Sequence, residues 1–379
     1  MAATPTDNRV RSDWAALARE LGPRFAARAA AHDASDAFVV ENYRDLRERH
    51  VFSTGVPAEL GGGGASHAEL GQMLRVLAQY CGSTALALSM HTHQVAIPAW
   101  RWRHEGAAVE PLLRRVAAEE LILVTSGGSD WLAGSGRAEK VDGGYRITSR
   151  KVFASGSPAG DLFMTMAVYD DPEVGPTVLH CAIPFNARGL EVQDNWRTLG
   201  MRGTGSNDVL LESVFVPDAA ISVRRPAGRW SPVWHVVATI ALPLIYSVYV
   251  GIAEAARALA LRQVAARGRD AGIQELVGLM DTELATARMA LRQMIDAGTS
   301  GHMGLETTNE VLIGRTVAGR ASIRTVEIAM EAVAGAGFFR DLGLERLFRD
   351  VQGARYHPVR GPAQQLYSGR LALGMDVNG

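Results

Sequence analysis

The sequence predicts an α+β protein that is mostly α-helical, with a β-domain between two helical regions. Three observations favour this fold class. Segments with 3.6-residue apolar periodicity run from Ser12 to about Glu120 and return beyond Arg229. Between them, short runs of β-branched and aromatic residues alternate with turn residues. The length of 379 residues exceeds what one hydrophobic core usually fills. We expect an N-terminal helical domain at 1–120, a middle β-domain at 121–225 and a C-terminal four-helix bundle at 226–379.

The N-terminal region contains a helix whose start is marked by its sequence. Ser66 stands three residues before Glu69, the spacing of a capping box in which each side chain binds the other residue's backbone N–H. Leu70 and Leu74 then fall on one face of the helix. We therefore expect a helix over residues 66–79 that packs into a core.

The middle region is expected to form a compact sheet or barrel that ends near Pro217. Asp142, Gly143 and Gly144 have the composition of a hairpin turn. The expected strands are Leu121 to Thr125, Tyr145 to Phe153, Leu162 to Tyr169, Thr177 to Pro184 and Val209 to Val216.

The C-terminal region has long periodic segments that predict an antiparallel helical bundle, over residues 252–266, 275–297 and 310–333. An apolar stretch precedes them, from Val233 to Ala253. Polar residues and a proline interrupt this stretch, so we expect a buried helix and not a membrane span.

Composition narrows the possible functions. The formal net charge is -1, with 47% hydrophobic and 21% charged residues, so no strong field attracts nucleic acid or an anionic membrane. Cys81 and Cys181 match neither a disulfide scaffold nor a zinc site. The N-terminus lacks the apolar stretch of a signal peptide. We expect a cytoplasmic protein whose partners are small molecules or other subunits.

An ordered set of motifs resembles the acyl-CoA dehydrogenase superfamily. Glycine clusters alone are weak evidence, because they commonly form plain turns. Here the motifs cover most of the chain in the family's order. They are the segments 55–62, 83–91, 125–130, 151–156, 199–206, 335–341 and 345–350. The resemblance implies the acyl-CoA dehydrogenase fold and a bound flavin.

The resemblance also assigns residues to the flavin. In the family, the segment matching Thr125 to Asp130 lies against the flavin, and the one matching Phe153 to Ser155 faces its ring. Hydroxyls and backbone amides can match the carbonyl and N–H groups of the flavin's pyrimidine edge. The expected flavin-binding residues are Thr125, Ser126, Ser129, Phe153, Ser155, Gly335 and Gly337, and the expected substrate-side residues are Arg202 and Thr204.

A simpler interpretation of these residues stays open. Serine and threonine also close turns at strand ends, glycine ends helices, and arginine often lies in solvent. The family favours FAD as the cofactor, and FMN is the alternative. Family members usually carry an arginine and a Phe-Gly pair that hold the neighbouring subunit's FAD, and the matching stretch 266–272 has no phenylalanine.

The sequence departs from the dehydrogenases at the catalytic base. Those enzymes need a carboxylate that removes a proton from the carbon next to the thioester. The family places this glutamate in one of two positions, which here correspond to Ala241 and to Arg360 or Gly361. Neither position offers a carboxylate, so dehydrogenation would need a base displaced to another place.

His357, Pro358 and Val359 resemble instead the C-terminal segment of flavin monooxygenases of this fold, such as dibenzothiophene monooxygenase and isobutylamine N-hydroxylase. Those enzymes receive reduced flavin from a partner reductase, and they need a dry pocket and a proton donor. The expected catalytic residues are His357 and His91, because imidazole exchanges protons near neutral pH. His93 is a further candidate, although a lone histidine is usually a packed or surface residue.

Three functions therefore remain open from the sequence: a two-component flavin monooxygenase, an acyl-CoA dehydrogenase with a displaced base, and a non-catalytic flavoprotein of the same fold. The first two are flavin-dependent oxidoreductases acting on a small-molecule substrate. The resemblance also implies a homotetramer, arranged as a dimer of dimers with the flavin near a subunit interface.

Overall fold

The computed structural model describes residues 13–128 and 130–379. Its helical, β, helical order confirms the predicted fold class. The N-terminal helices are α1 (Trp14–Ser35), α2 (Val40–Glu48), α3 (His67–Ala78), α4 (Gly82–Glu105) and α5 (Glu110–Glu119). The capping box predicted at the start of α3 is present: the Ser66 N–H donates to Glu69 Oε2 at 2.8 Å, and the Glu69 N–H donates to Ser66 Oγ at 3.3 Å.

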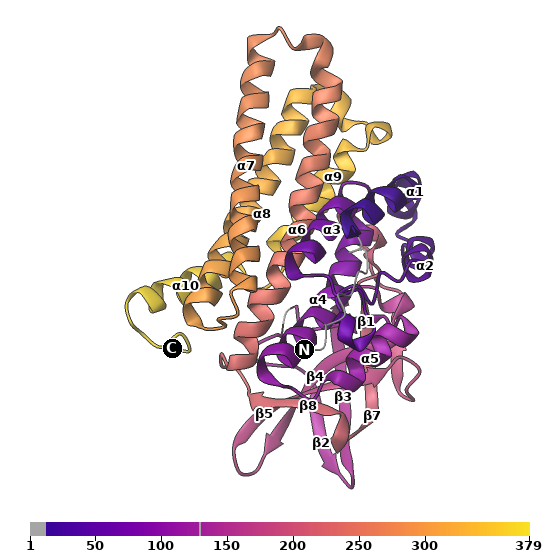
Figure 1. Ribbon diagram of the computed structural model, residues 1–379, viewed down its shortest axis with the longest axis vertical. Coiled ribbons are helices and arrows are strands. Elements are labelled where there is room, and N and C mark those ends of the chain that lie inside the picture. Colours follow the sequence, from indigo (N-terminus) through magenta and orange to yellow (C-terminus); the bar gives the residue numbers. More distant parts are fainter. Residues whose placement is uncertain (1–12, 129) are drawn as a thin grey trace, which may run out of the picture.

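The middle region forms one mixed sheet at one end of the molecule (Figure 1). Its strand order is β6-β7-β3-β2-β4-β5-β8, and β1 pairs in parallel with β4. All five predicted strands are found, and the predicted turn at 142–144 joins β2 to β3. The strands are β1 (Leu123–Thr125), β2 (Arg137–Val141), β3 (Gly144–Ala154), β4 (Leu162–Asp171), β5 (Gly175–Pro184), β6 (Leu190–Val192), β7 (Asn207–Pro217) and β8 (Ile221–Pro226).

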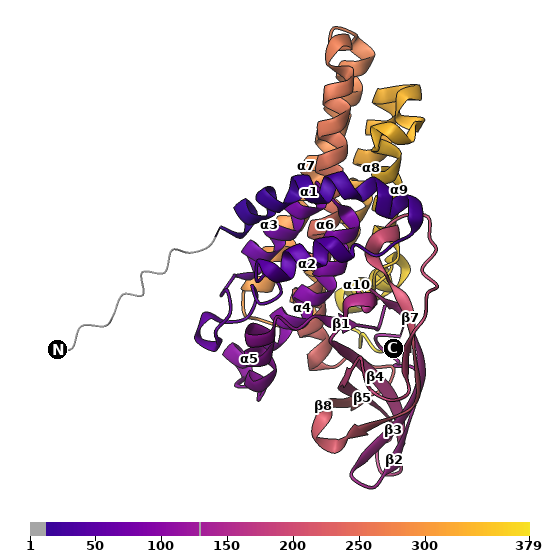
Figure 2. The same ribbon diagram turned by 90° about the vertical axis from the view of Figure 1, so that its right-hand side faces the viewer.

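Long helices form the rest of the molecule, and the turn between α6 and α7 projects away from the sheet (Figures 1 and 2). The sequence predicted a buried apolar helix followed by a separate periodic segment, whereas the structure joins both into α6. The helices are α6 (Pro232–Val264), α7 (Ala271–Thr299), α8 (Leu305–Val333), α9 (Leu344–Val351) and α10 (Gly361–Ala372). By length and composition α6 could cross a membrane, but 94% of its most apolar window is buried inside the protein. It is the core helix.

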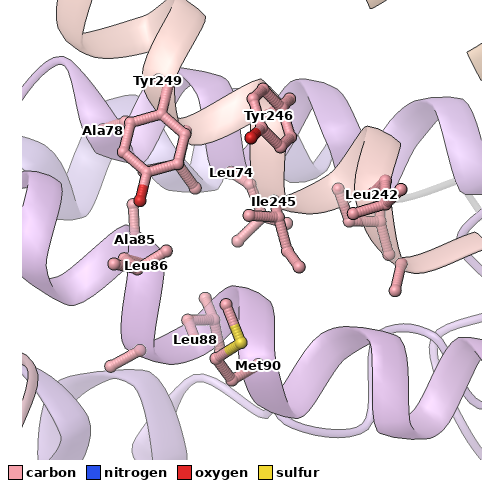
Figure 3. Packing of buried hydrophobic residues seen from close by; sticks show 14 of the residues in the cluster. Leu74, Ala78, Ala85, Leu86, Leu88, Met90, Leu242, Ile245, Tyr246 and Tyr249 are labelled. Carbon is pink, nitrogen blue, oxygen red and sulfur yellow. The ribbon is translucent and has the colours of Figure 1, made fainter. Parts of the chain in front are cut away.

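The packing of α6 against α3 and α4 builds one wall of the site. Figure 3 shows the side chains that these helices contribute, and Tyr246 and Tyr249 are fully buried among them. Met90 of α4 and Ile245 of α6 point into the space between the two helices, and both line the cavity described next. Burial of these apolar side chains is the main favourable term in forming this region.

Candidate active site

A cavity of about 600 Å³ lies where α4, α6, the sheet and the segment before α10 meet. This volume falls within the usual range for small-molecule sites. Most of its lining is apolar or aromatic. The polar and charged side chains that line it are His93, Gln94, Arg101, Thr125, Ser126, Ser155, Thr165, His180, Cys181, Thr198, Ser206, Ser222, Tyr249, Arg349, Gln352, Tyr356 and His357.

No carboxylate lines this cavity within the described part of the chain. Ala241 is part of the wall, at one of the two positions where the family resemblance placed the missing glutamate. Arg360, at the other position, is exposed and lies at the start of α10. A substrate C–H proton therefore meets no glutamate or aspartate among the described lining residues.

His357 forms a hydrogen-bonded pair with Tyr249 at one part of the wall. The Tyr249 hydroxyl lies 2.5 Å from His357 Nε2. That hydroxyl has no other hydrogen-bond partner among residues 13–128 and 130–379, and its proton would otherwise be unpaired, so we infer that it donates to Nε2. In a neutral imidazole the proton must then lie on Nδ1. The His357 backbone carbonyl accepts a hydrogen bond from the buried Arg315 at 2.6 Å, which holds the turn in place.

Burial keeps this pair uncharged. Burial, together with the nearby Arg315 charge, lowers the pKa of His357 to about 3. Burial also raises the pKa of Tyr249 well above its ordinary value. At neutral pH both groups are neutral, and His357 offers one N–H from Nδ1.

The sequence ranked His91 ahead of His93 as a catalytic candidate, whereas the structure places His93 at the cavity. His93 lines the cavity, and its Nδ1 donates to the Ser89 carbonyl at 3.0 Å, which leaves Nε2 as an acceptor. His91 lies outside the cavity. Its Nε2 donates to the Phe52 carbonyl at 2.7 Å and its Nδ1 accepts from the Leu123 N–H at 3.0 Å. Both nitrogens are used, so His91 ties α4 to β1.

Four of the predicted flavin-binding residues line the cavity: Thr125, Ser126, Phe153 and Ser155. Phe153 is 50% exposed, although it is a large apolar residue at the end of β3. Its backbone φ of 59° lies in the left-handed region. Residues other than glycine rarely adopt this conformation, and those that do often lie at functional sites. A flat ring could cover its exposed surface. Ser129 lies outside the described residues.

A buried ion pair anchors the loop that follows β1. Lys151 Nζ lies 2.8 Å from the Asp130 carboxylate and donates to the Ser135 carbonyl at 2.9 Å. Burial alone would raise the pKa of Asp130, but the Lys151 charge and hydrogen bond lower it below its ordinary value. Because Lys151 stands two residues before Phe153 in β3, this pair fixes the loop and the strand end together.

A chain of hydroxyls lies behind Ser155. Thr204 Oγ1 donates to the Met201 carbonyl at 2.9 Å, Ser206 Oγ lies 2.7 Å from Thr204 Oγ1, and Ser155 Oγ lies 2.7 Å from Ser206 Oγ. A carbonyl can only accept, so with Thr204 donating to Met201 we infer that Ser206 donates to Thr204 and that Ser155 donates to Ser206. The Ser155 oxygen then presents lone pairs to the cavity, so it acts as an acceptor.

The row of hydroxyls behind Ser155 changes the role expected for Thr204. Thr204 is fully buried and does not line the cavity, so it acts through Ser206. Arg202 does not line the cavity either. Its guanidinium donates to the Thr198 carbonyl at 2.9 Å and lies 3.6 Å from Asp36, so it ties this loop to the end of α1.

Gly335 and Gly337 lie away from the cavity, in the 3-10 turn Ala334–Phe338 that follows α8. Phe338 and Phe339 beside them are 85% and 70% exposed.

Sequence reasoning missed several residues of the cavity: Tyr249, Ser206, His180, Trp131 and Trp234. Tyr249 carried a usable signal, because a hydroxyl inside an apolar helix needs a hydrogen-bond partner. His180 and the two tryptophans lie in different segments, and only the folded chain brings them together.

Comparison with known proteins gives two family matches. Residues 8–120 match the family described as Acyl-CoA dehydrogenase, N-terminal domain, and residues 242–357 match Acyl-CoA dehydrogenase, C-terminal domain. Amino sugar nitrososynthase DnmZ of Streptomyces peucetius is 28% identical, over 93% of this chain and 91% of that protein. Dibenzothiophene monooxygenase of Mycolicibacterium goodii is 26% identical, over 95% and 92%.

A solved structure of KijD3, in complex with FMN and dTDP-3-amino-2,3,6-trideoxy-4-keto-3-methyl-D-glucose, is similar over nearly the whole fold. Its TM-score is 0.88 with 26% identity, over 99% of this chain and 97% of that one.

Proposed function

This chain belongs to the acyl-CoA dehydrogenase superfamily, and on that premise we propose that it is a flavin-dependent monooxygenase. It would use reduced flavin and O₂ to oxidise a small organic substrate. The observation that carries the proposal is the absence of a carboxylate among the described residues that line the cavity. Without that base the dehydrogenase reaction lacks its proton acceptor. The relatives named as a nitrososynthase and a monooxygenase support the same choice.

The cavity residues fit a flavin. Thr125 and Ser126 offer hydroxyls, and the exposed face of Phe153 offers a stacking surface. The Ser155 acceptor suits an N–H group, and a reduced flavin carries an N–H at N5 that the oxidised form lacks. FMN is the first ligand to test, because KijD3 was solved with FMN and stretch 266–272 lacks the aromatic residue expected for FAD. FAD, favoured by the sequence, is the second.

When bound, the flavin would supply electrons and activate oxygen; the protein supplies a dry cavity and positioned hydrogen bonds. His357 would donate a hydrogen bond from Nδ1 toward the reacting oxygen, and Tyr249 holds the ring in the orientation that allows this. His93 Nε2 would accept a hydrogen bond from the substrate. Apolar side chains such as Met90, Leu242 and Ile245 would exclude water.

We also propose the partners and location of the enzyme. A flavin reductase would supply the reduced cofactor, as the monooxygenase resemblance implies. A homotetramer is supported by the exposed Phe338 and Phe339, which another subunit would cover. A cytoplasmic location is supported by Cys81 and Cys181, which are both free. Light scattering at micromolar concentration tests the assembly, and a monomer would contradict it.

Isotope labelling tests the function. Purified protein would receive FMN, NADH and a flavin reductase under oxygen-18 gas, with a panel of small amines, organosulfur compounds and aromatic compounds. We expect at least one product that carries one oxygen-18 atom, and we expect the His357→Ala variant to lose it. No labelled product from any member of the panel, together with flavin bleaching by an acyl-CoA, would favour the dehydrogenase.

A further inference from the structure

A second group of cavity residues has no role in the proposed chemistry. His180 of β5, Trp234 at the start of α6, and Trp131 of the loop after β1 all line the cavity. Trp131 and Trp234 meet edge to face, with ring centroids 5.1 Å apart. We call this group, with Arg225 behind it, the His180 subsite.

Arg225 fixes the orientation and the tautomer of His180. The Arg225 side chain is buried, and it donates to the Leu132 carbonyl at 2.6 Å and to the Trp131 carbonyl at 2.8 Å. Its Nε donates to His180 Nε2 at 3.0 Å. A guanidinium can only donate, so Nε2 must carry a lone pair and the single imidazole proton must lie on Nδ1.

The Nδ1–H of His180 has no acceptor in the part of the chain that the structure describes. Burial, followed by the charge of Arg225, lowers the pKa of His180 to about 3, so the ring stays neutral. The site therefore offers a donor of fixed position. The indole N–H of Trp234 also has no partner among the described residues, but it is buried below the cavity surface.

The surroundings of this donor restrict its ligand. Trp131 and Trp234 provide aromatic surface, and Met166 and Val223 provide apolar surface. The Arg225 guanidinium lies over the Trp234 ring, 4.7 Å from its centroid. The subsite therefore has a positive charge next to one of its aromatic walls. No described lining residue is acidic, and the nearby Asp130 is already paired with Lys151, so the lining offers no carboxylate to a cationic ligand.

We propose that the His180 subsite binds the substrate, and that the substrate is an aromatic molecule that carries an uncharged or anionic hydrogen-bond acceptor. His180 Nδ1 donates to this acceptor, while the tryptophans contact the ring. The inference rests on the proposed function, because it names the substrate class of the same cavity. His180 acts here as a specificity residue and takes no part in oxygen chemistry.

The test compares two isosteric neutral probes and one cationic probe in binding measurements on the full-length protein with saturating oxidised FMN. Acetophenone carries a carbonyl acceptor, α-methylstyrene replaces that oxygen by a methylene group, and benzyltrimethylammonium carries a cation. Quenching of tryptophan fluorescence reports binding. We expect acetophenone to bind about tenfold more tightly than α-methylstyrene, the value of one hydrogen bond to a buried donor, and the cation to bind most weakly.

Two variants assign the difference to His180. His180→Phe keeps a ring but removes the donor, so acetophenone should lose its advantage while α-methylstyrene binds as before. His180→Asn places an amide N–H near the position of Nδ1, so it should keep part of the advantage. Unchanged binding of α-methylstyrene shows that each variant keeps the folded cavity.

Four results would overturn the proposal: equal binding of the two neutral probes, an acetophenone preference that survives in His180→Phe, no binding of either neutral probe, or loss of acetophenone binding when FMN is added. The last result would assign the donor to the flavin. None of these results depends on oxygenation, so the proposed function can fail or succeed separately.

Discussion

His357 and Tyr249 share one hydrogen bond, and it leaves the imidazole with a single proton on Nδ1. Loss of a positioned hydrogen-bond donor in an active site typically slows a reaction about 10²- to 10³-fold. We expect His357→Ala to lower the rate of substrate oxygenation by this factor and to increase the share of O₂ released as hydrogen peroxide. Tyr249→Phe should have a smaller effect, because it removes only the orienting contact. FMN affinity, measured by fluorescence titration, should stay nearly constant in both variants; normal coupling in His357→Ala would contradict this role.

The hydroxyl chain behind Ser155 gives a second residue-scale prediction. Ser206→Ala removes the acceptor to which Ser155 donates, so Ser155 becomes free to donate into the cavity. Affinity for reduced FMN should fall and affinity for oxidised FMN should rise. The ratio of the first affinity to the second should therefore decrease about fivefold. Anaerobic fluorescence titrations with both redox forms measure this ratio. Ser222→Ala is the matched control, because Ser222 lines the same cavity outside the chain of hydroxyls. An unchanged ratio in Ser206→Ala would refute the polarity of the chain.

At this scale, five of the residues expected from the sequence line the cavity, namely Thr125, Ser126, Phe153, Ser155 and His357, and their roles there stay predictions. It ranked His91 ahead of His93, and the structure brings His93 to the cavity. The reason is physical: the first three turns of α4 are buried on every side, so no apolar face indicates how the helix is rotated.

Among the elements, α6 depends on a close approach to α3. A Cβ atom added at Gly251 would lie 2.2 Å from the Arg75 carbonyl oxygen and 2.8 Å from the Ala78 Cβ, so the helices would have to separate. We expect Gly251→Ala to destabilise the protein by about 1–3 kcal/mol. Gly278→Ala on α7 is the control, since nothing lies within 4 Å of its added Cβ, and it should stabilise by roughly 0.5–1 kcal/mol. Urea unfolding measures both; equal effects of the two changes would refute the close contact.

The elements were predicted from the sequence where a strong period or a cap was present. The capping box located the start of α3, and five apolar runs located five strands. Strands β2, β6 and β8 were missed, because they are short and carry charged residues, as in the Arg137–Val141 strand. Their pairing depends on neighbouring strands that no local pattern reveals.

For the whole molecule, buried neutral histidines predict sensitivity to acid. Burial lowers the pKa of His91 and His93 to about 4 and that of His180 and His357 to about 3, from the ordinary value of 6.5. Below pH 6.5 these histidines bind protons in the unfolded chain but stay neutral in the folded chain. The free energy of unfolding therefore falls as the pH decreases toward the folded pKa values. Each group costs roughly 1.4 kcal/mol per pH unit in this window.

Asp350 acts in the opposite direction over part of the same range. Burial raises its pKa to about 6, so its contribution to stability is present at low pH and is lost as the pH rises through that value. The four histidines outnumber it, and we expect the melting temperature to decrease from about pH 7 to about pH 5 at constant ionic strength. Asp350→Asn should steepen this decrease. A melting temperature that stays constant or rises on acidification would contradict the burial of neutral histidines.

The central claim is that this cavity oxygenates its substrate and does not dehydrogenate acyl thioesters, because no described lining residue is a carboxylate. Anaerobic mixing of the FMN-loaded or FAD-loaded protein with a panel of acyl-CoA thioesters tests it most directly, with flavin absorbance as the readout. Our account predicts that the flavin stays oxidised with every thioester and is bleached only when a reductase and NADH are added. Stoichiometric bleaching by any acyl-CoA without a reductase would contradict it.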